Sequence, residues 1–264
     1  MRLVSGSDMQ IDYDKMAEVF DATRSQDPRL LDSVALGISA IAGKGERVLD
    51  IGTGTGRFLS PLVKIGIDAY GLDISKNMLR KAREKGLTNL IQGDAVRLPF
   101  SDRAFKASLV TNVLHLVTGW KDLMLEASRV SDRAVIAVDN GRDRENPMEV
   151  FKSIMKERGF TPPMVGPREN ELAKCCAPEC RIRLGEYEER TTKEEVLSNF
   201  RMKTYTFQSE LTEEENRWCI EEFGRRCAEE IVIPQTVTLI VWNPERLREK
   251  IPGVTFGYPH STTF

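Results

Sequence analysis

The sequence predicts an α/β fold: a Rossmann-like, doubly wound and mostly parallel sheet, with an antiparallel last strand and a helical insertion after the fifth strand. Short apolar runs alternate with stretches of helical periodicity from residue 47 to residue 139, which favours parallel strands joined by helices. The first apolar run leads into DIGTGTGRF, with glycines at alternate positions. A strand, a tight glycine turn and a helix start in this order are typical of the ligand-binding edge of an open sheet.

Each predicted element rests on a local pattern. Residues 12–24 and 28–42 have helical periodicity, and Pro28 suits a first helical turn. The region that follows contains apolar runs of strand length with amphipathic segments between them. The strands are predicted near 47–51, 67–73, 88–93, 105–112 and 133–139, and the helices near 55–66, 75–86 and 119–130.

The alternation stops after the fifth predicted strand. Residues 141–200 contain a short helix ending near Gly159, a proline-rich breaker and a charged stretch, so we expect an insertion with its own helices. The last two strands are expected at 201–208 and 234–242. Between them, Thr212 begins a capping-box pattern, which predicts a helix start there.

Composition favours a protein of the cytoplasm. Hydrophobic residues make up 41% of the 264 residues and charged residues 30%. No apolar run approaches the roughly 18 residues of a membrane span, and the N-terminal MRLVSGSDMQ lacks a signal-peptide pattern. The net charge of −2 provides no overall electrostatic footprint for nucleic acid.

The five cysteines raise the question of a metal site, because KCCAPEC holds three of them. Structural zinc sites use paired CxxC or Cys/His knuckles. The cysteine spacing here differs from these patterns, and the chain has only two histidines. We therefore predict no metal and interpret the cysteines as reduced thiols, with a zinc site or a cysteine nucleophile as the alternatives left open.

Three aspartates each close an apolar run, namely Asp50, Asp73 and Asp94. The carboxyl ends of parallel strands meet at one edge of a sheet, so these carboxylates are expected to share one crevice. Repulsion by the carboxylates makes that crevice unsuitable for a pyrophosphate. A cationic ligand with a ribose and an adenine suits it better, because ammonium, hydroxyl and amine groups donate hydrogen bonds to carboxylates.

Other interpretations of the glycine loop are a P-loop, a dinucleotide fold and a ligand-free turn. A P-loop would need Gly-Lys-Ser/Thr and a dinucleotide fold GxGxxG or GxGxxA, whereas Arg57 and Phe58 follow the last glycine here. A glycine turn in a ligand-free α/β domain stays open as the purely structural alternative.

Over residues 10–140 the chain resembles the class I S-adenosylmethionine-dependent methyltransferases, in particular the small, single-domain members of the methyltransferase type 11 kind. The resemblance implies S-adenosyl-L-methionine as the cofactor and S-adenosyl-L-homocysteine as the product. It also implies that the loop from Asp50 to Gly56 cradles the methionine part, that Asp73 holds the ribose hydroxyls, and that Asp94 reads the adenine amino group. The implied cofactor-binding residues are Asp50, Gly52, Thr53, Gly54, Gly56, Asp73, Ile74, Asp94, Ala95 and Asn112.

His115 is the candidate catalytic residue, because the loop after the fourth strand faces the transferable methyl group in this family. A base or acceptor-positioning role, a cofactor contact, and simple packing beside Leu114 and Leu116 remain open for it. Amino-methyltransferases of nucleic-acid bases carry Asn/Asp-Pro-Pro-aromatic in this loop. Here Asn112 is followed by Val113, which argues against that subclass.

Tyr13, Phe20 and Arg24 belong to a YDxxAxxFDxxR pattern that similar methyltransferases carry ahead of the first strand. A helix packed on the sheet and a lid over the site are both open for it. Together with Asp139, these are the predicted acceptor and lid residues. The single domain is divided into an N-terminal helical cap (1–45), a cofactor-binding core (46–140), an insertion acting as acceptor lid (141–200), and last strands with a C-terminal tail (201–264).

We therefore predict a methyltransferase that uses S-adenosylmethionine to methylate a small-molecule acceptor by in-line displacement. Acceptor choice is expected to reside in residues 141–200 together with the N-terminal helix. The alternatives are an RNA or protein methyltransferase whose acceptor surface lies in the insertion, and a non-catalytic module that binds S-adenosylmethionine. Nucleic acid is not favoured as a partner and no membrane is predicted, while the acceptor's identity and the oligomeric state are not predicted.

Overall fold

A seven-stranded sheet forms the centre of the computed structural model, which describes residue 20 and residues 27–141, 146–160, 165–203 and 205–256. The strand order is β3-β2-β1-β4-β5-β7-β6. β1 to β5 are parallel, whereas β7 is antiparallel to both β5 and β6. The mostly parallel sheet with an antiparallel last strand is thus confirmed. The strands are β1 (Arg47–Ile51), β2 (Asp68–Asp73), β3 (Leu90–Gln92), β4 (Phe105–Val110), β5 (Ser131–Asp139), β6 (Cys180–Thr192) and β7 (Glu230–Trp242).

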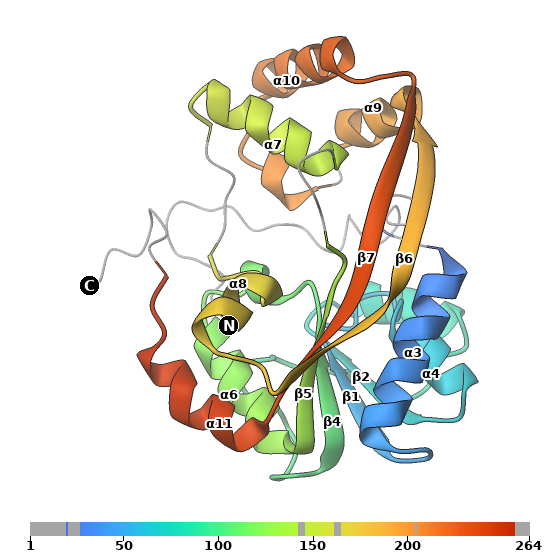
Figure 1. Ribbon diagram of the computed structural model, residues 1–264, viewed down its shortest axis with the longest axis vertical. Helices are drawn as coiled ribbons and strands as arrows, with labels where there is room; N and C mark the ends of the chain where they lie inside the picture. The colour runs from blue at the N-terminus through green and yellow to red at the C-terminus, as the bar shows by residue number, and fades with distance from the viewer. Residues whose placement is uncertain (1–19, 21–26, 142–145, 161–164, 204, 257–264) are drawn as a thin grey trace.

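Helices cover both faces of the sheet (Figure 1). Successive residues of β1 show why: Val48 packs in one apolar cluster with α3 and α4, and Leu49 packs in a second cluster with α6 and α11. This alternation is the period of a strand buried on both sides. The helices of these layers are α3 (Pro28–Ala42), α4 (Leu59–Lys64), α5 (Lys76–Glu84), α6 (Trp120–Val130), α8 (Glu169–Cys175) and α11 (Pro244–Lys250). None of the described helices is long and apolar enough to cross a membrane.

A separate helical lobe is formed by α7 (Pro147–Glu157), α9 (Lys193–Arg201), the 3-10 helix η2 (Thr206–Gln208) and α10 (Glu213–Arg226). The paired strands β6 and β7 run from the sheet to this lobe (Figure 1). The lobe has an apolar core of its own, in which Phe151 lies against Phe200 with ring centroids 4.2 Å apart. The Arg226 guanidinium joins α10 to α7 through two hydrogen bonds to the Glu157 carboxylate.

The expected strand at 201–208 is wrong. Arg201 ends α9, and residues 206–208 form η2. The aromatic residues that suggested a strand instead fill the core of the lobe, where Phe207 is buried. Gln208 fixes this turn, since its Nε2 donates to the Phe200 carbonyl at 2.9 Å and to Asn216 Oδ1 at 2.8 Å.

Besides β5, β7 pairs with β6, which lies in the segment expected to be a helical insertion. Its sequence, CRIRLGEYEERTT, alternates charged and other residues because the strand lies at the edge of the sheet with much of its surface exposed. The helices α7 and α10 lie where helices were predicted, whereas α4 begins at Leu59 rather than near 55, and α11 was not predicted. The helix expected at 12–24 lies outside the described residues, Phe20 excepted.

Candidate active site

One cavity lies at the carboxyl edge of the sheet, where β1, β2 and β4 end. Asp50, Asp73 and Asp94 all line this cavity, so the structure brings the three predicted carboxylates together. Phe20, Arg57 and apolar side chains complete the wall. The other lining residues are Gly52, Thr53, Gly54, Phe58, Leu72, Ile74, Met78, Gly93, Ala95, Thr111, Asn112, Val113, Leu116 and Val117.

Asp50 is the penultimate residue of β1, before the buried Ile51, and is itself only 3% exposed. The Thr53 hydroxyl donates to its Oδ2 at 2.7 Å. Burial raises the pKa of Asp50 to about 7, and the nearby Asp73 carboxylate adds to this shift, while the Thr53 hydrogen bond opposes it. A cationic group bound beside Asp50 would lower that pKa again.

Asp73 ends β2 and accepts two backbone N–H groups. Gly54 donates to its Oδ2 at 2.8 Å, and Ser75 donates to its Oδ1 at 2.9 Å. Burial raises the pKa of Asp73, although these N–H bonds favour its charged form. Each carboxylate oxygen accepts through more than one lone pair, so both oxygens retain capacity to accept from a ligand hydroxyl.

Three glycines of the loop have positive φ, but their surroundings differ. At Gly54 (φ 57°) an added Cβ would meet nothing within 4 Å, and the residue borders the cavity. At Gly52 (φ 75°) a Cβ would come within 2.8 Å of Val113 Cγ2, and at Gly56 (φ 79°) within 2.2 Å of Leu87 Cδ1. Gly56 does not line the cavity, so its place in the structure is one of close packing rather than ligand approach.

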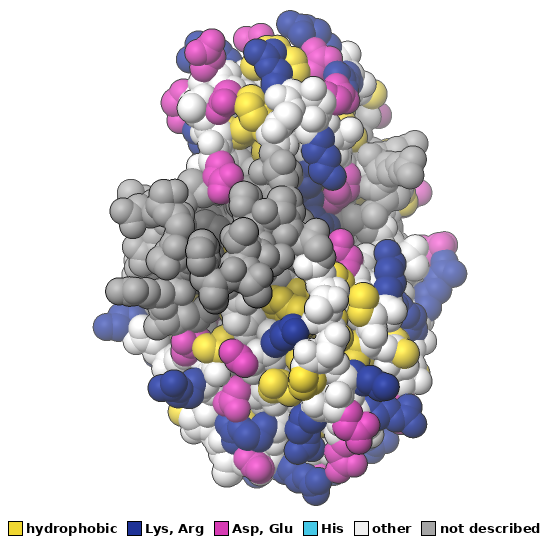
Figure 2. Space-filling model, turned by 90° about the vertical axis from the view of Figure 1, so that its left-hand side faces the viewer, with side chains coloured by type: hydrophobic (Ala, Val, Ile, Leu, Met, Phe, Trp, Pro, Cys, Tyr) yellow, Lys and Arg dark blue, Asp and Glu magenta, His cyan; other side chains and the backbone are white. Residues whose placement is uncertain are grey.

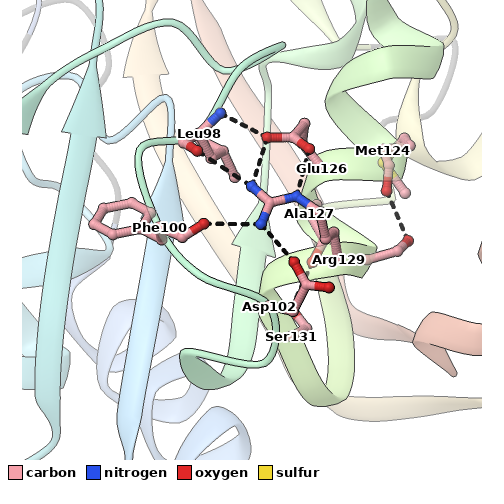
Figure 3. Close-up of polar contacts among 9 residues, drawn as sticks. Leu98, Phe100, Asp102, Met124, Glu126, Ala127, Arg129 and Ser131 are labelled. Carbon is pink, nitrogen blue, oxygen red and sulfur yellow. Dashed lines mark hydrogen bonds and ion pairs between the residues drawn. The ribbon is translucent and has the colours of Figure 1, made fainter.

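The loop between β3 and β4 carries Asp94 and Ala95 into the cavity. Asp94 Oδ1 accepts the Val96 N–H at 3.0 Å. Further along this loop, the Arg129 guanidinium of α6 donates to the Leu98 and Phe100 carbonyls (Figure 3).

Glu126, on the same helix as Arg129, completes the clamp on this loop. Its carboxylate accepts the Leu98 N–H at 2.7 Å and also receives two hydrogen bonds from Arg129. One turn of α6 therefore holds the backbone of the loop that presents Asp94 (Figure 3).

The loop after β4 forms a second side of the cavity, and Asn112 lies at its start with φ 56°. His115 lies in the 3-10 helix η1 (Leu114–Leu116) and is half-buried. Its side chain does not line the described cavity. Asp139, at the end of β5, accepts the Gly141 N–H at 3.1 Å and is also absent from the described lining.

The predicted lid residues are only partly described. Phe20 borders the cavity, whereas Tyr13 and Arg24 lie outside the described residues. Within the described ranges no three His, Cys, Asp or Glu side chains form a group that could hold a metal ion. The five cysteines are free thiols, of which Cys176 and Cys219 are buried.

Besides lining residues such as Arg57 and Thr111, two contacts that support the site were not predicted from the sequence. The first is the Arg129 and Glu126 clamp. The second is Glu169, whose Oε1 accepts the Asn112 N–H at 2.6 Å across 57 residues of sequence. Spacing along the chain carries no signal for a contact of this kind, because it depends on how α8 packs beside β5.

Comparisons with known proteins agree with this architecture. Residues 49–136 match the family described as methyltransferase domain. A demethylmenaquinone methyltransferase of Renibacterium salmoninarum is 34% identical over 125 residues, which cover 45% of this chain and 52% of that protein. The enzyme of the same name from Beutenbergia cavernae is 32% identical over 140 residues, or 47% of this chain and 55% of that protein. The chain thus spans about half the length of these curated relatives.

Solved structures share the fold at low sequence identity. The YcgJ protein from Bacillus subtilis superposes with a TM-score of 0.53 at 17% identity, covering 80% of this chain and 97% of that chain. A protein from Bacillus halodurans C-125, solved as a candidate methyltransferase, has a TM-score of 0.52 at 18% identity. The match covers 79% of this chain and 96% of that chain. Residues 49–136, which include the glycine loop and the three aspartates, match the methyltransferase domain family, and the solved structures share the fold.

Proposed function

We propose that the protein transfers the methyl group of S-adenosylmethionine to a small-molecule acceptor. The observation that carries this proposal is the cavity in which Asp50, Asp73 and Asp94 meet beside the Gly54 turn. Carboxylates at the ends of three neighbouring strands suit a ligand with an ammonium, a ribose diol and an exocyclic amine. They oppose a pyrophosphate, because like charges repel strongly in a partly buried site.

The lining residues fit the cofactor in polarity as well as in charge. Gly54 has no Cβ and an open space where one would lie, so the backbone leaves room for the methionine part. We assign the ribose hydroxyls to Asp73 and the adenine amino group to Asp94. Ile74 and Ala95 provide apolar surface beside these two carboxylates, which suits the faces of a purine ring.

The bound cofactor supplies a methyl group already activated by its sulfonium, so the chain has mainly to orient it and the acceptor. The loop of residues 111–117 would form the wall on the acceptor side. A general base is required only if the acceptor loses a proton during transfer. His115 is our candidate for that role, because it lies on this loop, although its side chain does not border the described cavity.

An apolar, uncharged acceptor fits the described part of the cavity best. Val113, Leu116 and Val117 make its wall after β4 apolar, and Arg57 is the only Lys or Arg among the described lining residues. The relatives named demethylmenaquinone methyltransferases are consistent with such an acceptor. An RNA acceptor would favour a block of positive charge, whereas Figure 2 shows basic and acidic side chains intermingled on the visible face.

The proposal is tested in two steps. Calorimetry with S-adenosylhomocysteine and with NAD measures which ligand the cavity takes, and we expect binding of the first alone. A screen with methyl-labelled S-adenosylmethionine then offers demethylmenaquinone, small amines and hydroxylated aromatics, and bulk RNA as acceptors. Label transfer to a small molecule supports the proposal. Binding without transfer to any acceptor would favour a non-catalytic module, and binding of NAD alone would refute the assignment.

A further inference from the structure

The loop of residues 111–117 contributes five residues to the cavity, more than any other described segment after β2. They are Thr111, Asn112, Val113, Leu116 and Val117. Yet the loop starts from an unfavourable backbone, since Asn112 has φ 56°. This left-handed conformation destabilises a residue with a Cβ by about 1 kcal/mol, Asn being among the least affected. The wall therefore depends on contacts from elsewhere to keep its shape.

Glu169 supplies the strongest of these contacts. It begins α8, is only 7% exposed, and its Oε1 accepts the Asn112 N–H at 2.6 Å. A carboxylate that accepts a backbone N–H in a buried setting makes a hydrogen bond roughly twice as strong as a neutral pair. Glu169 thus stabilises Asn112, the residue of the loop with the left-handed backbone conformation.

The residues just before Glu169 touch the same loop twice more. The Val165 N–H donates to the His115 carbonyl at 3.4 Å, a weak bond. Gly166 lies so close to the Leu114 carbonyl oxygen that an added Cβ would be 2.3 Å from it. We call residues 165–169 the latch.

The latch is fixed to the core on one side and to the helical lobe on the other. Behind it, α8 buries Leu172, and the Trp242 indole donates to the Cys176 carbonyl at 2.8 Å. On the lobe side, the Arg168 guanidinium donates to Glu149 Oε1 of α7 at 3.2 Å. The latch therefore joins α7, α8 and the cavity wall in one chain of contacts.

We propose that Glu169 is a positioning residue that holds the 111–117 wall in its binding shape, and that it links this wall to the helical lobe through Arg168 and Glu149. The inference rests on the proposed function, in which this wall faces the transferable methyl group. Glu169 acts through Asn112 and is not assigned a contact with cofactor or acceptor. Loosening the bond should therefore change the dynamics of the wall and the affinity for the cofactor together.

The test combines hydrogen–deuterium exchange over residues 105–120 with calorimetry of S-adenosylhomocysteine binding. Glu169→Ala should speed exchange at Asn112 by about tenfold and weaken binding by about tenfold. Glu169→Gln keeps a side-chain oxygen that can accept the N–H, so both effects should be smaller. A purely structural role would lower the melting temperature and leave exchange at Asn112 and the affinity unchanged.

Glu195→Ala is the matched control. Glu195 also accepts a backbone N–H, that of Thr192 at the N-terminus of α9, but it lies in the lobe away from the wall. This variant should leave the exchange of residues 105–120 and the affinity as in the wild type. If Glu169→Ala does not fold, Glu169→Asp withdraws the carboxylate by one methylene and should give effects in the same direction. If Glu169→Ala, or Glu169→Asp in its place, folds and exchanges at Asn112 as fast as the wild type, the inference is overturned. A wild-type protein that binds no S-adenosylhomocysteine refutes the proposed function instead, and the exchange data still test the Glu169 bond.

Discussion

The Gly54 N–H donates to Asp73 Oδ2 at 2.8 Å, so the carboxylate at the end of β2 holds the glycine loop that follows β1. The same carboxylate accepts the Ser75 N–H at the start of α5. Asp73 thereby joins two neighbouring strand ends before any ligand is bound. A site prepared in this way loses less conformational freedom on binding.

Replacing Asp73 by Ala should weaken binding of S-adenosylhomocysteine by at least tenfold. The change removes the charged acceptor that we assign to the ribose, where each hydrogen bond would be worth roughly 1.5 to 3 kcal/mol, and it also releases the Gly54 N–H. Calorimetry measures the affinity. Asp68→Ala, at the opposite end of β2, is the control and should bind as the wild type. Equal affinities for the two variants would remove Asp73 from the site.

Asp50 predicts a pH dependence of folding stability. Its pKa is raised from 3.8 to about 7 in the folded protein, so between these values the folded state holds a proton that the unfolded chain has released. The unfolding free energy should therefore fall as pH rises from about 4 to about 7. Asp50→Asn mimics the protonated form and should lose the part of this dependence that Asp50 contributes, whereas the part from Asp73, whose pKa burial also raises, remains. Urea titrations at pH 5 and pH 7.5 measure the unfolding free energy of the wild type and of Asp50→Asn. An equal change with pH in both proteins would contradict the raised pKa of Asp50.

The raised pKa of Asp50 also predicts that binding of S-adenosylmethionine releases a proton. The ammonium and sulfonium of S-adenosylmethionine favour the Asp50 carboxylate, so the affinity should rise between pH 5.5 and pH 7 and level off above it. Calorimetry at pH 6.5 in two buffers of different ionisation enthalpy measures the released protons. Asp50→Asn should release fewer protons than the wild type. Unchanged proton release in this variant would show that another group titrates.

Two glycine substitutions separate packing from binding. Gly56→Ala adds a Cβ at positive φ against the buried Leu87 side chain, and should lower the unfolding free energy by roughly 2 to 4 kcal/mol. Gly54→Ala meets open space, so it should lower that free energy by about 1 kcal/mol but weaken S-adenosylhomocysteine binding about tenfold by filling the cavity. Thermal unfolding and calorimetry on both variants measure the two effects. The reverse ranking would show that Gly56 lies at the ligand, as the resemblance implied for it together with Gly52 and Gly54.

The parts of the site that could be predicted from sequence are those at the ends of apolar runs. Asp50 and Asp73 lie at the carboxyl ends of β1 and β2, and Asp94 follows β3. The apolar runs of these strands are visible in the sequence, and parallel pairing then brings the three aspartates together. β6 could not be predicted, because its charged residues reflect an exposed edge and resemble a polar insertion. Glu169 depends on the packing of α8 beside β5, a contact between distant segments that no local pattern encodes.

Arg129 predicts a link between stability and adenine binding. Arg129→Ala removes hydrogen bonds to the Leu98 and Phe100 carbonyls and should lower the unfolding free energy by about 2 kcal/mol after allowing for solvent screening of a partly exposed group. The loop that presents Asp94 would also loosen, so affinity for S-adenosylhomocysteine should fall several-fold. Arg103→Ala removes an exposed ion pair with Glu245 and serves as the control. If Arg129→Ala were as stable as Arg103→Ala, the hydrogen bonds of Arg129 to the loop would contribute nothing to the unfolding free energy.

The last prediction concerns the helical lobe. None of the described cavity-lining residues belongs to it, so removing the lobe should spare cofactor binding and abolish transfer to the acceptor. A deletion of residues 141–190 would also remove Glu169 and most of β6. A cleaner excision replaces 193–229 with Asn-Gly, since Thr192 and Glu230 are paired neighbours and this turn closes a hairpin.

The same variant needs a flexible linker in place of residues 142–160, because α7 would otherwise expose the apolar face that packs in the lobe. Its affinity for S-adenosylhomocysteine should stay within about tenfold of the full chain, because Glu169 and β6 remain, although Arg168 loses its contact with Glu149. Methyl transfer to the acceptor found in the screen should be lost, because long connections over a site usually serve its function. Retained transfer, or loss of cofactor binding in a well-folded variant, would show that the lobe does not cover the acceptor.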